Sequence, residues 1–235
     1  MKLANIGKNK NNMEKHIVKI ESIEKVTHDV IRIVTEKPAG YTFNPGQATE
    51  ITIEKTGWQN EKRPFTFTCL PDDDYLEFTI KTYPTHKGVT NKLLQLKKND
   101  ELILHEVFGA ISYKGDGVFI AGGAGVTPFI SIFRHLQSKS KIGSNMLVFA
   151  NKTKADIILE KEFNKMLGNA FINILSDEKV VGYHHGRITE DFLKATLSGV
   201  NQQFYVCGPP PMMEAILKQL TSLGVGENSI TKEEI

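Results

Sequence analysis

Hydrophobic and polar residues alternate in short runs through the first half of the chain. Between positions 16 and 113 these runs are rich in Val, Ile, Thr and Phe, and Gly, Pro, Asn and Asp separate them. Regular short strands with such turn residues are typical of an antiparallel barrel or sandwich. One helix interrupts them, from Thr90 to Leu96, with Thr90 as its expected N-cap. The predicted strands are Ile17–Ile23, Val30–Thr35, Ala48–Ile53, Phe65–Cys69, Leu76–Thr82 and Glu101–Val107.

The pattern changes after Tyr113, where strand-like runs begin to alternate with helical ones. This alternation predicts a mostly parallel sheet with helices on both faces. The expected strands are Val118–Ala121, Met146–Ala150, Phe171–Ser176 and Gln203–Cys207, and the expected helices are Pro128–Gln137, Leu159–Leu167, Thr189–Ala195 and Pro210–Ser222. We therefore predict a disordered polar tail at residues 1–14, a β domain at residues 15–113 and an α/β domain at residues 114–235.

Composition narrows the class of protein. The chain has 235 residues, of which 40% are hydrophobic and 24% charged, as is ordinary for a soluble globular protein. Its 29 basic and 27 acidic residues give a net charge of +2, which does not favour nucleic acid or a membrane surface as a partner. The two cysteines, Cys69 and Cys207, are too few for an iron–sulfur or structural zinc site, so we predict no metal. A reducing, cytoplasmic setting is expected.

A glycine-rich turn, residues 122–128, stands between the first strand and the first helix of the α/β part. Glycine lets the backbone approach a phosphate closely, and the helix N-terminus that follows attracts anions. Pro128 suits the first turn of that helix. The turn therefore predicts a dinucleotide phosphate site, and the alternative is a turn without a ligand. A third glycine and the acidic residue about 20 positions later are missing, so the unit is not of the ordinary dehydrogenase type.

Two further motifs carry candidate chemistry. In the β domain, Arg63 could bind a phosphate, Phe65 could cover a flat ring, and Thr66 offers a hydroxyl; the alternative is a strand with an edge arginine and core phenylalanines. Near the end, Cys207 lies at the carboxyl end of a predicted parallel strand, where α/β sheets place their ligands. The alternative for Cys207 is a buried structural cysteine.

Together and in this order, the three motifs resemble those of the ferredoxin–NADP reductase superfamily. Its flavin motif is Arg-x-Tyr-Ser/Thr, its nicotinamide motif is Gly-Gly-x-Gly-x-Thr-Pro and its late motif is Cys-Gly-Pro-Pro-x-Met. The segments 43–47, 88–90, 108–109 and 186–188 also resemble family turns, so the resemblance runs from about His16 to Ile235. It implies an N-terminal antiparallel β-barrel that binds FAD, followed by a parallel-sheet α/β domain that binds the nicotinamide nucleotide.

The resemblance also implies roles for individual residues. Arg63 would bind the FAD pyrophosphate, Phe65 would stack on the isoalloxazine, and Thr66 would hydrogen-bond near its hydride-accepting nitrogen. The other implied FAD-binding residues are Pro64, Lys81, Gly88, Val89 and Thr90. The implied nicotinamide-nucleotide residues are Gly123, Gly125, Thr127, Pro128, Ser176, Cys207, Gly208 and Pro209. Thr66, Cys207 and the near-terminal Glu233 form the expected catalytic group, in which Cys207 shapes the pocket and is not a nucleophile.

Departures from the family motifs refine these expectations. Phe65 replaces a tyrosine and loses one phenol hydrogen bond, of about 0.5–1.5 kcal/mol, so FAD binding should be retained. Plant-type members end in an aromatic residue, whereas this sequence ends in Ile235, and we expect a less blocked flavin face. The sequence has no cysteine cluster, so the electron acceptor is expected to be a separate molecule.

The resulting hypothesis is an FAD-dependent oxidoreductase. It would take hydride from NADH or NADPH and pass single electrons to ferredoxin, flavodoxin, an oxygenase component or a haem protein. NADH is favoured because Asp177 and Glu178 follow Ser176 and would repel a 2′-phosphate, although Lys152 and Lys154 could compensate. One alternative is a non-catalytic FAD-binding electron-transfer subunit of a larger complex. Another is a nucleotide-binding module without redox chemistry.

Overall fold

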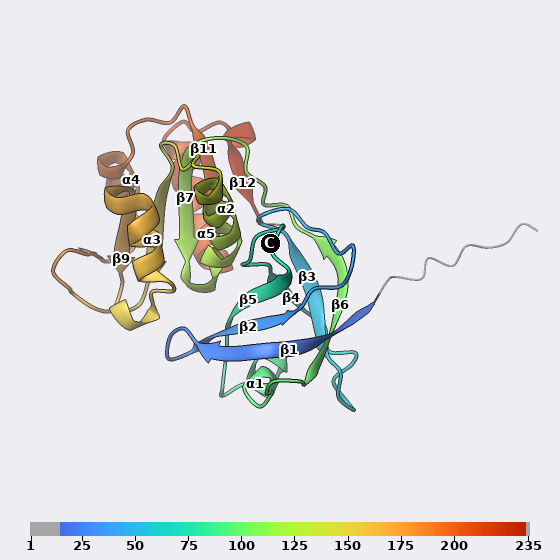
Figure 1. The fold of residues 1–235 in the computed structure, drawn as a ribbon. Helices are drawn as coiled ribbons and strands as arrows, with labels where there is room; N and C mark the ends of the chain where they lie inside the picture. The colour runs from blue at the N-terminus through green and yellow to red at the C-terminus, as the bar shows by residue number, and fades with distance from the viewer. Residues whose placement is uncertain (1–14, 234–235) are drawn as a thin grey trace, which may run out of the picture.

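The structure, a computed structural model, describes residues 15–233. The predicted tail at residues 1–14 lies outside this range. The described chain forms two six-stranded sheets, an antiparallel one followed by a parallel one, and they build two adjacent bodies (Figure 1). The predicted fold class is therefore confirmed.

The first sheet is an antiparallel barrel with strand order β4-β3-β6-β1-β2-β5. A bridge between Phe67 and Phe78 joins the chain after β4 to β5 and closes the ring. Inside it, apolar side chains such as Ile20, Ile33 and Leu104 are wholly buried, because alternate strand residues point inward. The strands are β1 (His16–Lys25), β2 (Val30–Glu36), β3 (Ala48–Ile53), β4 (Arg63–Thr66), β5 (Tyr75–Lys81) and β6 (Glu101–Phe108).

Most barrel strands begin and end within two residues of their predicted bounds, and two elements need a fuller correction. The strand predicted over Phe65–Cys69 is β4, Arg63–Thr66. It ends at Thr66 because the chain there stops pairing with β3 and turns toward β5. The helix α1 spans Val89–Leu93 and its N-cap is Gly88, so the prediction of Thr90 as N-cap was wrong. Gly88 is extended and its carbonyl accepts the Lys92 N–H at 3.0 Å, which starts the helix one residue earlier.

The second sheet is parallel throughout, with strand order β10-β9-β8-β7-β11-β12. Its strands are β7 (Gly117–Gly122), β8 (Met146–Asn151), β9 (Phe171–Leu175), β10 (His184–His185), β11 (Gln203–Cys207) and β12 (Ile230–Lys232). The helices are α2 (Thr127–Ser138), α3 (Glu160–Leu167), α4 (Glu190–Thr196) and α5 (Pro210–Ser222). Short 3₁₀ turns are η1 (Gly123–Val126), η2 (Lys154–Asp156), η3 (Gly168–Ala170) and η4 (Glu227–Ser229).

Helices cover both faces of this sheet, as the alternating pattern predicted. Phe129 and Phe133 of α2 pack with Phe163 of α3 on one face, and α4 and α5 pack on the other through residues such as Leu193 and Ile216. The first of these cores also contains Val30 of the barrel. The two bodies therefore share packing on the side of α2.

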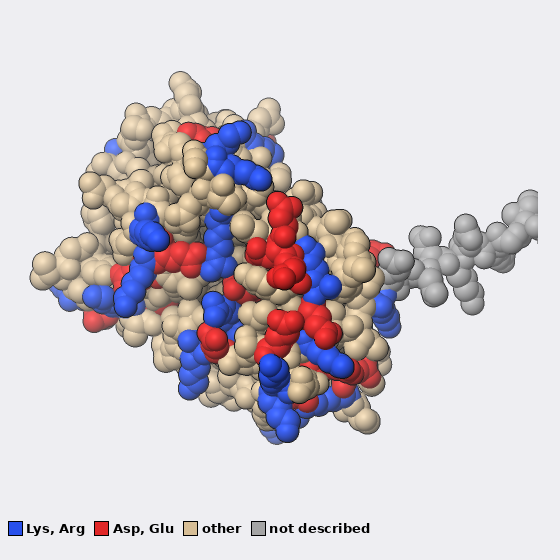
Figure 2. Space-filling view, in the orientation of Figure 1, with Lys and Arg blue, Asp and Glu red and all other residues tan. Residues whose placement is uncertain are grey.

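The surface carries charges of both signs. Figure 2 shows basic and acidic side chains interspersed over the face that Figure 1 presents. Among residues 15–233, none of the helices has the length and apolar character needed to cross a membrane.

Candidate functional site

The two predicted cofactor motifs meet where the barrel contacts α2. Thr66 ends β4, and Thr127 begins α2 directly after the glycine turn. The Thr127 hydroxyl lies 3.4 Å from the Thr66 hydroxyl and also 3.0 Å from the Ala124 carbonyl, to which it donates. Residues 61 positions apart in the sequence are thus side by side at the junction of the two sheets.

The glycine turn is shaped by close backbone packing. A Cβ added to Gly125 would lie 2.5 Å from the carbonyl carbon of Cys207 and 2.6 Å from the Cα of Gly208, so only glycine fits there. Gly123 has a positive φ of 51°, and within the described chain an added Cβ would enter open space. Gly125 therefore joins the turn to the late motif, and Gly123 leaves room beside the backbone for a ligand.

Cys207 lies at the carboxyl end of β11, as predicted, and is 3% exposed. Its thiol donates to the Glu233 carboxylate, with Sγ 3.3 Å from Oε2, because β12 pairs with β11 and brings the following residue alongside. Burial, and next the negative charge of Glu233 and its hydrogen bond, raise the pKa of the thiol above its ordinary value. The thiol therefore remains protonated, which agrees with a role as a contact and not as a nucleophile.

The flavin motif leaves a cation available at the barrel surface. The side chain of Arg63 is 48% exposed; its guanidinium donates to the Lys62 carbonyl at 2.6 Å and lies 3.7 Å from the Glu61 carboxylate. Pro64 is exposed, and Phe65 and Thr66 are half-buried. Several guanidinium N–H groups thus remain for an anion such as a pyrophosphate.

The turn at residues 88–90, which the family resemblance assigns to FAD binding, lies at the start of α1. Val89 is 1% exposed and anchors the turn in the barrel core, whereas a Cβ added to Gly88 would enter open space within the described chain. Gly88 and Thr90 are half-buried. The open backbone here and the available cation of Arg63 fit an FAD pyrophosphate.

Lys81 has a different environment from the other predicted FAD residues. Its ammonium group forms an ion pair of 2.9 Å with Asp29, in the turn between β1 and β2. Burial raises the pKa of Asp29, but the hydrogen bond and the positive charge of Lys81, with smaller effects of its neighbours, outweigh it and lower the pKa. His28, Asp29 and Asp156 lie close enough to share a cation, but Asp156 already accepts from the backbone N–H and hydroxyl of Thr153.

Ser176, beside which a 2′-phosphate of the nucleotide is expected, follows β9 directly. The Ser176 hydroxyl donates to the Asp177 carboxylate at 2.6 Å, and the Glu178 carboxylate accepts the Lys154 N–H at 2.7 Å. The Lys154 ammonium lies 5.3 Å from the centre of the Tyr183 ring. Two carboxylates therefore follow Ser176, one of them hydrogen-bonded to its hydroxyl, while the Lys154 ammonium group is directed at an aromatic ring.

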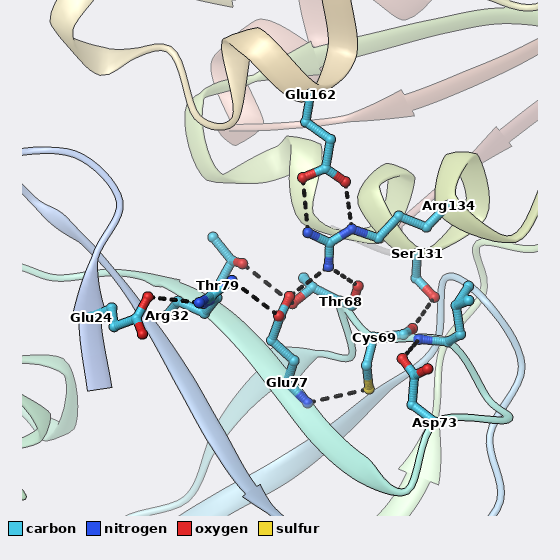
Figure 3. Close-up of polar contacts among 11 residues, drawn as sticks. Glu24, Arg32, Thr68, Cys69, Asp73, Glu77, Thr79, Ser131, Arg134 and Glu162 are labelled. Atoms are coloured by element: carbon cyan, nitrogen blue, oxygen red, sulfur yellow. Dashed lines mark hydrogen bonds and ion pairs between the residues drawn. The ribbon is translucent and has the colours of Figure 1, made fainter. Parts of the chain in front are cut away.

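Sequence analysis missed two residues that join the halves of this site. Ser131 and Arg134 of α2 donate hydrogen bonds to carbonyls of Cys69 and Thr68, in the chain after β4 (Figure 3). Both follow Thr127 at helical spacing, four and seven positions later. Three polar residues at helical spacing, among the mainly apolar residues that begin this helix, were a signal that could have identified them.

Comparisons with known proteins agree with this geometry. A family model described as an FAD-binding domain matches residues 15–156, more than half of the chain. A second, described as an oxidoreductase NAD-binding domain, matches residues 119–218. The chain belongs to the ferredoxin–NADP reductase superfamily.

The curated relatives named here share less than 30% of their aligned residues with this chain. The reductase component of propane 2-monooxygenase from Rhodococcus jostii (strain RHA1) is 28% identical over 230 residues, covering 90% of this chain and 61% of that protein. NADH-cytochrome b5 reductase 2 from Mycosarcoma maydis is 27% identical over 219 residues, covering 84% of this chain and 62% of that protein. The chain thus spans about three fifths of the length of these relatives.

Solved structures share the fold over nearly the whole chain. A ferredoxin NADP+ reductase from Neisseria gonorrhoeae, with bound FAD and NADP, superposes with a TM-score of 0.83 at 18% identity, covering 93% of this chain and 98% of that one. The FAD/NAD-binding domain of a nitric oxide dioxygenase from Vibrio cholerae O1 biovar El Tor gives a TM-score of 0.82 at 20% identity, with 92% and 97% covered.

Proposed function

We propose that this reductase-superfamily member is an NAD(P)H-dependent flavoprotein reductase that supplies electrons to a separate redox protein. The observation that carries this proposal is the meeting of the flavin motif and the glycine turn, with the Thr66 and Thr127 hydroxyls 3.4 Å apart. A flavin held by one and a nicotinamide held by the other would lie against each other. When bound, FAD would supply the chemistry of accepting hydride and releasing single electrons.

On the flavin side, each residue of the chain has a proposed task. Arg63 would pair with the pyrophosphate, helped by the open backbone from Gly88 to Thr90. Phe65 would cover the isoalloxazine, with Pro64 beside it, and Thr66 would donate its hydroxyl near the hydride-accepting nitrogen. Lys81, already paired with Asp29 at 2.9 Å, would contribute positive charge at the edge of this site.

On the nicotinamide side, the chain would orient the ring and exclude water. Gly123, Gly125, Thr127 and Pro128 would hold the nucleotide along the turn. The late motif, Cys207 with Gly208 and Pro209, would form the wall beside the ring. Glu233 would keep the Cys207 proton in place through their 3.3 Å contact, so that the thiol presents a neutral surface to the reacting atoms.

NADH is the proposed electron donor in preference to NADPH. A 2′-phosphate near Ser176 would meet the carboxylates of Asp177 and Glu178, which raise the cost of bringing an anion there. The Lys154 ammonium group is directed at the Tyr183 ring, and we propose that it stays there and does not bind a 2′-phosphate beside Ser176. A clear preference for NADPH, measured as the ratio of kcat/KM values, would contradict this assignment.

The acceptor is proposed to be a ferredoxin, a flavodoxin or an oxygenase component. Relatives named as reductase components of oxygenase systems support this class of partner.

We further propose a cytoplasmic location and a division between an FAD domain ending at residue 113 and a nicotinamide domain beginning at residue 114. In support of the proposed division, no strand or helix spans residues 113 and 114, because β6 ends at Phe108 and β7 begins at Gly117.

Anaerobic titration tests the function. The purified protein, loaded with FAD, is titrated with NADH while the visible flavin absorbance is followed, and NADPH is used in a parallel titration. Bleaching by one equivalent of NADH is the expected result. A yellow protein that neither donor bleaches would contradict the reductase and favour the alternative, an FAD-binding subunit of a larger complex. Failure to retain FAD at all would contradict both.

A further inference from the structure

One face of α2 contacts the barrel at three successive levels. Thr127, Ser131 and Arg134 are spaced four and three residues apart, which places them on the same side of a helix. Thr127 reaches Thr66 at 3.4 Å, Ser131 donates to the Cys69 carbonyl at 2.9 Å, and Arg134 donates to the Thr68 carbonyl at 2.7 Å. All three partners belong to the segment that ends β4 and continues beyond it.

Arg134 makes the strongest of these contacts. Besides Thr68, its guanidinium binds the Glu77 carboxylate of β5 at 2.6 Å and both carboxylate oxygens of Glu162 of α3, at 2.6 and 2.9 Å. Figure 3 shows this side chain between the two bodies, with Glu162 on one side and Glu77 and Thr68 on the other. Burial lowers the pKa of Arg134, but the hydrogen bonds with Glu162 and the charge of Glu77 outweigh it and raise the pKa above its ordinary value.

Glu77 anchors the barrel side of the contact. Its side chain is 5% exposed, and its carboxylate accepts the Thr68 hydroxyl at 2.8 Å as well as the Arg134 guanidinium. Within the barrel, the Arg32 guanidinium lies 3.8 Å away. A buried carboxylate needs such partners, because an uncompensated charge in the interior is costly. Thr68 is therefore held at both its hydroxyl and its carbonyl.

The threonine pair cannot fix the site on its own. Two hydroxyls 3.4 Å apart form a weak hydrogen bond, whereas charged groups at 2.6–2.9 Å form strong, directional ones. Thr66 is two residues from Thr68, and Thr127 lies on the same rigid helix as Arg134. The distance between the flavin strand and the nicotinamide turn is thus set by the stronger contacts further along α2.

Resting on the proposed function, we propose that Ser131 and Arg134 are positioning residues for hydride transfer. They hold the backbone of Thr68 and Cys69 against α2 and thereby set the separation of the two cofactor half-sites. Reacting atoms must approach to about 3–3.5 Å, and a displacement of about 1 Å can slow a reaction about 100-fold. An interface that only stabilised the fold would leave this rate unchanged in a folded variant.

The main variant removes both buried charges together. In Arg134→Met/Glu77→Gln, no carboxylate is left stranded in the barrel, and both replacements are close in size to the originals. Arg134→Lys keeps a positive charge but lacks the planar fork, and Ser131→Ala removes one neutral hydrogen bond. The control is Arg32→Met, which takes away the other cation beside Glu77 and leaves every contact of α2 in place.

Two readouts are taken on FAD-loaded protein with confirmed flavin content. Stopped-flow reduction by NADH gives the limiting rate and the dissociation constant separately, and the long-wavelength charge-transfer absorbance reports ring stacking. Hydrogen–deuterium exchange of the peptide covering residues 66–69, measured without donor, reports how firmly this segment is held, independently of activity.

For the double variant we expect a limiting rate about 10- to 100-fold lower, weaker charge-transfer absorbance, faster exchange at residues 66–69 and a nearly unchanged NADH dissociation constant. In Ser131→Ala the limiting rate should be about 2- to 10-fold lower, as expected for the loss of one neutral hydrogen bond. The limiting rate of Arg134→Lys should fall between those of Ser131→Ala and the double variant, and that of Arg32→Met should equal the wild-type rate. If the double variant does not fold, Ser131→Ala and Arg134→Lys decide the question.

An unchanged rate in folded, loaded variants would overturn the proposal, and so would a slower rate without faster exchange at residues 66–69. A wild-type protein that neither donor reduces would instead contradict the proposed function. The exchange measurement still tests the contact of α2 with the flavin strand in that case, so the two failures are distinguishable.

Discussion

Replacing Gly125 with alanine tests how the nucleotide turn is built. The backbone of the turn packs directly on the backbone of the late motif, and an added Cβ would lie 2.5 Å from the Cys207 carbonyl carbon. Ordinary contact begins at 3.4 Å, and the Cys207 carbonyl oxygen is nearer still than the carbon, so one segment must move by at least about 0.9 Å, the difference between 3.4 and 2.5 Å. Its neighbours are backbone atoms at the end of a central parallel strand, which cannot rotate away as a side chain would.

This displacement predicts losses in both stability and rate. Overpacking of a close-packed interior costs about 1–3 kcal/mol, so the free energy of unfolding should fall by about that amount. A shift of nearly 1 Å beside the proposed nicotinamide ring should lower the rate of flavin reduction by about 100-fold. That factor corresponds to about 2.7 kcal/mol in activation free energy.

Chemical unfolding and stopped-flow reduction by NADH measure the two effects. Gly226→Ala is the matched control, because Gly226 has a φ of −69° that any residue adopts, and its added Cβ meets open space within the described chain. The control should keep wild-type stability and rate. A Gly125→Ala protein with wild-type stability and reduction rate would refute the packing argument.

Two further predictions concern the barrel. Arg63→Ala should weaken FAD binding about 10- to 100-fold, because charge-assisted hydrogen bonds are lost. The melting temperature should not fall, because the Arg63 side chain is 48% exposed. A fluorescence titration with FAD measures the affinity, and an unchanged affinity would contradict this prediction. Burial raises the pKa of the Cys69 thiol from 9.0 to about 12. The contribution of the protonated thiol to the free energy of unfolding is therefore complete below pH 9 and is lost as the pH rises from 9 toward 12. Cys69→Ala should therefore flatten the decline in unfolding free energy between pH 8 and 10.5, measured by urea titration, and equal slopes in both proteins would exclude this effect.

Much of the fold could be predicted from local pattern. The strands β3 and β11 have the predicted bounds, because runs of apolar and β-branched residues end there at clear turn residues. The edge strands β10 and β12 were missed. They contain two and three residues, His184–His185 and Ile230–Lys232, too few to show a period. They are strands only because β9 and β11 offer them a partner.

The residues of the candidate site also fall into two groups, those that local motifs identify and those that only the tertiary structure brings together. Arg63, the glycine turn and Cys207 stand in compact motifs that sequence alone could identify, and their roles as cofactor contacts stay predictions. Arg134 was overlooked, because an arginine late in an amphipathic helix is usually solvated; its spacing from Thr127 and Ser131 was a signal, but it did not name the partner. Its partner Glu77 lies 57 positions earlier, and only the packing of α2 on the barrel brings them together.

The strand order of the parallel sheet has a consequence for how the chain is made. The barrel is complete when Phe108 has been synthesised, since all its strands precede that residue. Strand β7, ending at Gly122, instead pairs with β11, which begins at Gln203, so about 80 residues must follow before its second edge is covered. At about 5–20 residues per second this apolar edge stays open for roughly 4–16 seconds on the ribosome. Nascent chains stalled within this interval should be the ones that chaperones bind and that aggregate.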